Sequence, residues 1–142
     1  MMRFRDEQGA VSTELAVLTP LLIGFMLLVV FAGRVAQAEG DVAHAAHEAA
    51  RAASLTATPS AAVEAAQATA YVNITEGGVA CRTLDVSVDT TNFAAGGQVA
   101  VVVTCEAAFG DIAMLAVPGS RTFTANAIEV IDTYRADTEA SP

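Results

Sequence analysis

The hydrophobic positions of this chain divide it into an apolar run near the N-terminus and a mixed remainder. Residues 15–33 contain no charged side chain, and a helix of this length measures roughly 28 Å. That length approaches the hydrocarbon thickness of a bilayer, and almost no polar residue marks one side of the run as solvent-facing. The run therefore predicts a membrane-spanning helix, with a kink at Pro20.

Beyond the apolar run, small and apolar residues recur at helical spacing as far as about Leu55. Val35, Val42 and Ala49 repeat every seven residues, and charged side chains flank this stripe. Such a face lets another helix approach closely, although the same stripe could instead pack on the protein's own sheet. We expect helix packing at these three positions, and the sequence leaves the partner open.

The second half of the chain has the pattern of a small mixed domain. Pro59 ends the first helix, and a short second helix is expected over about residues 61–72. Three strands are predicted, over residues 83–89, 98–106 and about 121–131. The fold class is therefore predicted to be α+β: a long N-terminal membrane-spanning helix, a short second helix and a small antiparallel sheet of about three strands.

The two cysteines, Cys81 and Cys105, both follow the apolar run. A membrane-spanning run would place them on the same non-cytoplasmic side, where a disulfide can persist. Folding the first two strands as a hairpin brings the cysteines together, but Cys81 is out of phase with the apolar positions of its strand. A bulge, or a strand that starts after Cys81, would remove this conflict. A disulfide is predicted, and two buried free thiols are the alternative.

The formal net charge is −9, with seven arginines and no lysine. Because there is no basic patch, we expect no nucleic-acid partner. Phosphate-binding loops, Gly-x-Ser-x-Gly and Cys-x-x-Cys are missing from the sequence, so no enzyme activity, cofactor or small-molecule substrate is predicted. His44, His47 and Glu48 do not form the zinc hydrolase pattern His-Glu-x-x-His, and no metal site is expected.

The charges that flank the apolar run bear on membrane orientation. Arg3 and Arg5 precede the run and Arg34 follows it, which favours a cytoplasmic N-terminus. A second interpretation is a cleaved secretory signal, because Ala36-Gln37-Ala38 fits a signal peptidase site. The run is longer than the usual apolar region of a signal peptide, which argues against cleavage after Ala38.

The motif Gly9-Ala10-Val11-Ser12-Thr13-Glu14 precedes the run. An ionisable group at the edge of a membrane helix is costly, so Glu14 is a functional candidate. The alternative is a carboxylate that simply reaches the lipid headgroups.

Residues 9–22, 31–34 and 45–51 resemble the conserved segment of TadE-like proteins, the minor pilins or pseudopilins of Tad (Flp-type) pilus systems. The resemblance implies that a prepilin peptidase cuts between Gly9 and Ala10 on the cytoplasmic side of the membrane. Glu14 then becomes the fifth residue of the mature chain. The cut creates an α-amine, and a neighbour's carboxylate can compensate that charge when the helix enters a dry bundle.

This resemblance also implies an organisation and a set of partners. We expect a leader over residues 1–9, a spine helix over 10–56 with its span at about 15–33, and an extracytoplasmic domain over 57–142 whose tail, 132–142, frays. The partners would be membrane lipid, other pilin subunits, the prepilin peptidase, and the pilus assembly platform and ATPase. The alternative function is an extracellular binding domain, either anchored by one span or released from a signal peptide.

Overall fold

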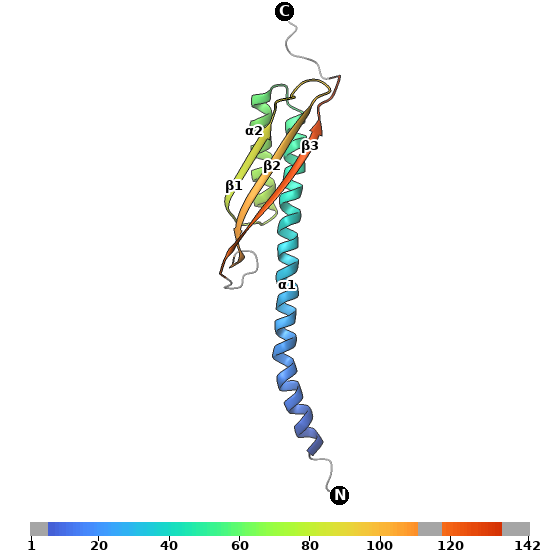
Figure 1. The fold of residues 1–142 in the computed structure, drawn as a ribbon, viewed down its shortest axis with the longest axis vertical. Helices are drawn as coiled ribbons and strands as arrows, with labels where there is room; N and C mark the ends of the chain where they lie inside the picture. Colours follow the sequence, from blue (N-terminus) through green and yellow to red (C-terminus); the bar gives the residue numbers. More distant parts are fainter. Residues whose placement is uncertain (1–5, 111–117, 135–142) are drawn as a thin grey trace, which may run out of the picture.

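The computed structural model describes the backbone of residues 6–110 and 118–134, and side chains from residue 14 onward within these ranges. The elements run in the order α1 (Asp6–Ser54), α2 (Pro59–Glu76), β1 (Cys81–Asp89), β2 (Gln98–Ala108) and β3 (Ser120–Val130). Figure 1 shows α1 as a long rod, with α2 and the sheet packed beside its C-terminal half. The predicted α+β fold class is confirmed.

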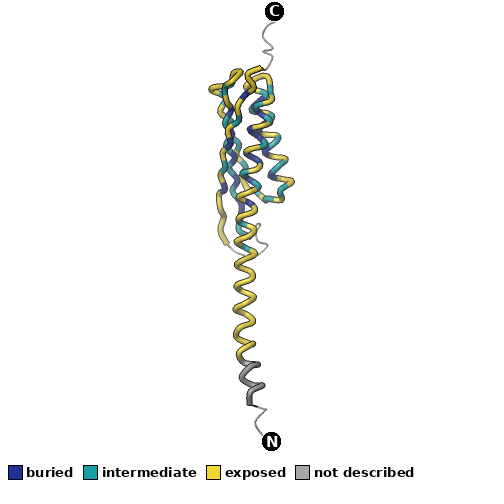
Figure 2. The backbone as a smooth tube through the Cα atoms, turned by 90° about the vertical axis from the view of Figure 1, so that its right-hand side faces the viewer, coloured by how far each residue is buried: buried dark blue, intermediate teal, exposed yellow. Residues whose placement is uncertain are grey.

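The N-terminal half of α1 projects away from the rest of the protein, and residues 14–30 within it are exposed (Figure 2). The helix passes through Pro20 without interruption. The hydroxyl of Thr19 donates a hydrogen bond to the carbonyl oxygen of Leu15 at 2.6 Å, in the turn that precedes this proline. Whether the axis bends at Pro20 stays a prediction.

The folded domain has two layers, in which α1 and α2 form one and the sheet forms the other (Figure 1). The helices contact each other through small side chains, which allow their backbones to approach closely. The buried positions are Ala38, Val42, Ala45, Ala46, Ala49, Ala50 and Ala53 of α1 and Ala62, Ala66, Ala70 and Ile74 of α2. The C-terminal half of α1 is therefore part of the core of the folded domain.

The sheet is antiparallel with strand order β1-β2-β3. Its inner face follows the alternation that the sequence predicts, because successive side chains of a strand point to opposite faces. The buried positions of the sheet and the residue after it are Val99, Val101, Val103, Cys105, Ala107, Ala108, Phe123, Ala127 and Ile131. Residues 90–97 join β1 to β2, and Gly96 there has a φ of 75°.

The second helix is longer than the predicted span of 61–72. Thr58 caps it by accepting a hydrogen bond from the N–H of Ala61 at 3.2 Å, and Pro59 occupies the first turn, where a missing N–H costs nothing. The helix ends before Gly77 and Gly78, and Gly78 has a positive φ of 74°. The strands also extend beyond the predicted bounds, because hairpin pairing continues to Cys81 and Ala108.

Parts of the predicted organisation fall outside the described residues. These include residues 1–5 of the predicted leader, with Arg3 and Arg5, and residues 135–142 of the predicted frayed tail. The division of the chain at residues 56 and 57 stays a prediction.

Candidate functional site

The predicted processing site lies near the start of α1. Because the helix begins at Asp6, the bond between Gly9 and Ala10 belongs to helical backbone. Glu14 is the first residue whose side chain the structure describes, and it is exposed. It follows Ala10 by four residues, which places both on the same side of the helix about 6 Å apart along its axis. An amine created at Ala10 would therefore lie one turn from a carboxylate.

The helix after Glu14 is apolar on every side. One segment of α1, within Glu14–Ser54, is long and apolar enough to cross a membrane, with a mean hydropathy of 2.7 and none of that window buried. The exposed side chains are Leu15, Val17, Leu18, Leu21, Leu22, Ile23, Phe25, Met26, Leu27, Leu28, Val29 and Val30. A surface of this kind suits a lipid environment or burial among other helices, because in water the whole apolar area would be exposed to solvent, which is unfavourable.

The predicted packing stripe of α1 faces its own chain. Val42 and Ala49 are fully buried, and Val35 is half-buried at the edge of the core. The partners that cover this face are α2 and strands β2 and β3. The structure thus answers the question that the sequence left open, since the partner of this stripe lies within the same chain.

Cys81 and Cys105 form a disulfide, with their Cα atoms 5.4 Å apart. Leu84, and not Cys81, lies directly opposite Cys105, and the ladder changes register between Cys81 and Thr83. This β-bulge removes the phase conflict in the sequence, because it turns Cys81 toward the inner face while Leu84 keeps its place there.

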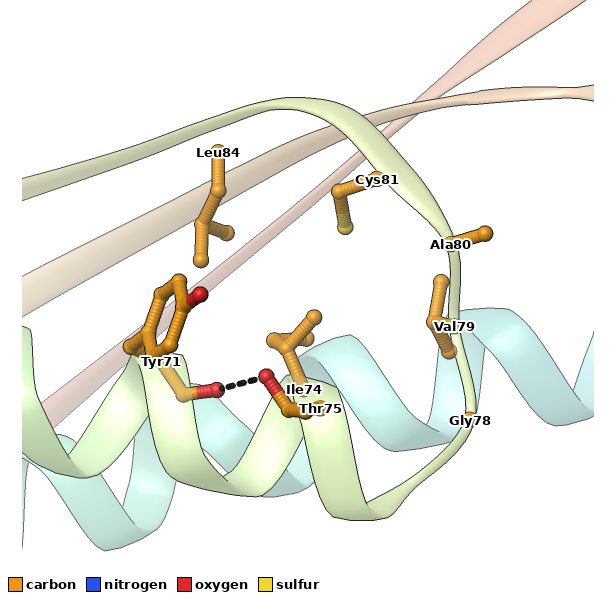
Figure 3. Close-up of a pocket in the computed structure, with 8 residues that line it drawn as sticks. All are labelled: Tyr71, Ile74, Thr75, Gly78, Val79, Ala80, Cys81 and Leu84. Carbon is orange, nitrogen blue, oxygen red and sulfur yellow. Dashed lines mark hydrogen bonds between the residues drawn. The ribbon is translucent and has the colours of Figure 1, made fainter.

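An open groove of about 350 Å³ lies beside this disulfide, between the C-terminal end of α2 and β1. Figure 3 shows Tyr71 and Ile74 on α2 facing Leu84 and Cys81 on β1. The hydroxyl of Thr75, which also lines the groove, donates to the carbonyl oxygen of Tyr71 at 2.8 Å. The lining of this groove has no charged side chain, and its polar side-chain groups are the hydroxyls of Tyr71 and Thr75.

The two histidines of α1 were considered in the sequence as possible metal ligands. His44 and His47 are exposed, whereas Glu48 beside them is half-buried. Among the described residues, no group of three or more potential ligands could hold a metal ion.

Two contacts of α1, one with β3 and one with the residue after β2, were not predicted from the sequence. Arg121 of β3 lies 4.0 Å from the carboxylate of Glu39 and also 5.3 Å from the ring centroid of Phe123. Nearer the N-terminus, the rings of Phe31 and Phe109 meet edge to face at 5.7 Å. Both contacts join residues that are far apart in the sequence, and local patterns carry no signal for such pairs.

Comparison with known proteins supplies one match. A search of curated proteins found none, and a search of solved structures also found none. The family match covers less than a third of the chain and stops within the C-terminal half of α1. Residues 9–51, which contain Gly9, Glu14 and the whole apolar run, match the family of TadE-like proteins, and this match confirms the resemblance seen in the sequence.

Proposed function

We propose that this protein is a TadE-like minor pilin or pseudopilin that takes part in assembling a Tad (Flp-type) pilus. Its role is structural rather than catalytic. The observation that carries the proposal is the family match over residues 9–51. This part of α1 includes the processing motif and the exposed apolar segment that follows it.

In this proposal the protein crosses the cytoplasmic membrane once, with its N-terminus in the cytoplasm and the two-layer domain outside. The disulfide between Cys81 and Cys105 supports an extracytoplasmic domain, because disulfides persist in oxidising compartments and are rare in the cytosol. The exposed Arg34 would mark the outer end of the span, at the height of the lipid headgroups.

A prepilin peptidase cuts between Gly9 and Ala10 in this scheme. A peptide bond within a helix is not accessible to a protease in an extended conformation. The start of α1, up to Ala10, must therefore unwind before the cut. Glycine disfavours a helix interior by about 1 kcal/mol relative to alanine, so Gly9 makes opening easier at the required place.

The cut leaves a positive amine on Ala10, and Glu14 supplies the opposite charge. An unpaired charge inside an apolar bundle is strongly unfavourable, so a subunit that leaves the membrane for a filament needs this compensation. The carboxylate can come from the same chain, one turn away, or from a neighbouring subunit. The remaining partners in this proposal are membrane lipid, other pilin subunits, and the assembly platform and ATPase.

Two other functions make different predictions about the mature chain. A single-pass anchored binding domain would keep Met1, and a domain released after Ala38 would begin at Glu39. Release would remove Phe31, which contacts Phe109, and Ala38, which is only 5% exposed in the core. These contacts favour a mature chain that keeps α1 from Ala10 onward.

Mass spectrometry of the natural protein tests the proposal. The protein would be isolated from membranes, from sheared filaments and from culture fluid, and its N-terminal peptide identified in each. We expect Ala10 as the first residue in membranes and filaments. Met1 throughout would contradict processing, and Glu39 in the culture fluid would support release of the domain.

A further inference from the structure

The contact between Phe31 and Phe109 fixes the height of the sheet relative to the apolar segment of α1. Phe31 lies within the uncharged run of residues 15–33, near its outer end. Phe109 directly follows β2, at the end of the sheet nearest the projecting part of α1 (Figure 1). Their ring centroids are 5.7 Å apart with an interplanar angle of 61°. This end of the sheet therefore lies beside the apolar run and not above it.

Phe109 is held in this position by Gly119, the residue that precedes β3. Its backbone N–H donates to the carbonyl oxygen of Gly119 at 3.0 Å. Gly119 has a φ of 119°, and a Cβ added there would lie 2.9 Å from the ring of Phe109. The ring thus occupies space that only a glycine leaves free, between Gly119 and Phe31.

The length of the helix places this contact within the membrane boundary. From Glu14 to Phe31 the helix rises by roughly 26 Å, which is less than the thickness of about 30 Å of a bilayer's hydrocarbon core. If Glu14 lies at the inner boundary, Phe31 lies just inside the outer one, and any tilt of the helix places it deeper. Arg34 follows three residues later at the height expected for headgroups.

We propose that the described residues that follow β2 and precede β3, namely Phe109, Gly110, Pro118 and Gly119 and here called the sheet base, rest in the outer headgroup region of the bilayer. This inference rests on the proposed membrane anchor and adds a second contact with lipid. Aromatic rings are favoured at this depth of a membrane.

The charges near the sheet base are compatible with contact with lipid. The carboxylate of Glu39 lies 4.0 Å from Arg121, and the carboxylate of Glu106 accepts a hydrogen bond from Ser120 at 3.0 Å. Pro118 and Gly119 are exposed and carry no charge. The four described residues of the sheet base therefore carry no charged side chain of their own and would hold the domain upright on the membrane.

Single-tryptophan variants of the full chain test this proposal, because the chain contains no tryptophan. Phe109→Trp reports on the sheet base, Phe31→Trp on the span, and Phe93→Trp on the turn at the opposite end of the sheet. Each variant would be reconstituted in phosphatidylcholine vesicles with and without bromine atoms on the acyl chains near the headgroup. We expect brominated lipid to quench the emission of Phe31→Trp and Phe109→Trp and to leave that of Phe93→Trp unchanged.

Tryptophan is larger than phenylalanine, so a second measurement avoids any change of fold. The chain has six phenylalanines, which can be replaced by the nearly isosteric 4-fluorophenylalanine. Spin-labelled phosphatidylcholine should broaden the fluorine resonances of Phe31 and Phe109 but not that of Phe93, with signals assigned by single Phe→Leu variants.

The outcomes separate this inference from the membrane anchor. If Phe31 responds to the lipid probes and Phe109 does not, the sheet base is off the membrane and the inference is wrong while the anchor stands. If Phe93 responds as strongly as Phe109, the domain lies flat on the bilayer, which also overturns it. If Phe31 itself does not respond, both the anchor and the inference fail.

Discussion

Leu84 lies directly opposite Cys105 in the ladder between β1 and β2, yet Cys105 forms its disulfide with Cys81, across a β-bulge. The bulge lets two inward-facing residues of β1 serve different purposes. Leu84 packs against the core and Cys81 links the start of β1 to β2. This link matters because most of the core between α1 and α2 is alanine, which buries little apolar area per residue.

We expect removal of the disulfide to cost a large part of the stability of the domain. The cysteines are 24 residues apart, and closing a loop of this size stabilises a protein by about 3 to 4 kcal/mol through the entropy of the unfolded chain. The double variant Cys81→Ala, Cys105→Val keeps the core filled and should lower the unfolding free energy by this amount. Denaturant titration of the full chain in detergent measures it.

A reducing agent provides the control for the disulfide prediction. It should destabilise the natural chain to the level of the double variant and leave the double variant unchanged. Equal denaturation midpoints for the oxidised chain and the double variant would contradict the prediction.

We expect Glu14→Gln to permit membrane insertion but to reduce incorporation into filaments by at least about tenfold, because a buried amine without its counter-charge costs several kcal/mol. Glutamine has nearly the same shape as glutamate, so the change isolates the charge. The measurement is the ratio of subunit in sheared filaments to subunit in membranes.

Glu64→Gln is the matched control for the assembly prediction, since Glu64 is an exposed carboxylate on α2, away from the apolar run. It should leave the filament-to-membrane ratio unchanged. Normal incorporation of Glu14→Gln would rule out the role proposed for Glu14.

The turn between β1 and β2 requires a glycine at position 97. A Cβ there would lie 2.1 Å from the carbonyl oxygen of Asn92 and 3.0 Å from that of Ala94, and both of these atoms are backbone. Gly97→Ala should therefore force the turn to move and destabilise the domain by about 2 kcal/mol or more. Thermal unfolding followed by circular dichroism would show a lower melting temperature.

Gly40→Ala is the opposite case and serves as the control. Gly40 lies inside α1, and an added Cβ meets nothing within 4 Å. Because alanine favours a helix more than glycine does, this variant should stabilise the protein by about 0.5 to 1 kcal/mol. If Gly97→Ala did not lower the melting temperature relative to the natural chain, the assignment of the turn constraint would be wrong.

Asp89 gives the turn a dependence on pH. The backbone N–H of Thr91 donates to the Asp89 carboxylate at 2.9 Å and holds the pKa of Asp89 below its ordinary value. The ionised form is thus favoured in the folded state. Its stabilising effect is present above the pKa of the unfolded chain and is lost as the pH falls through the lower pKa of the folded chain.

Carboxyl carbon NMR against pH would measure the titration of Asp89 directly. We expect a midpoint below that of Asp89 in the unfolded chain. In Asp89→Asn the acid-induced loosening of the turn should disappear. A midpoint equal to that of the unfolded chain would show that the Thr91 hydrogen bond does not favour the ionised form.

The elements of this fold could largely be predicted from local sequence patterns. The alternation of Leu84, Val86 and Val88 identified a strand, and the uncharged run of 15–33 identified a helix, because each period matches one backbone geometry. The ends of elements were less accurate. Capped by Thr58, α2 begins at Pro59, earlier than predicted. Strand pairing also continues past the alternating residues, since caps and partners fix where an element begins and stops.

The sequence by itself determined the motif from Gly9 to Glu14, the uncharged run of 15–33 and the α+β class, because these depend on residues that are near one another along the chain. Only the tertiary structure decided that the stripe of Val42 and Ala49 packs within its own chain. It also decided that Phe31 meets Phe109 beside the apolar run. A small-residue face accepts any close partner, and contacts between distant segments depend on how the layers pack, which no local pattern encodes.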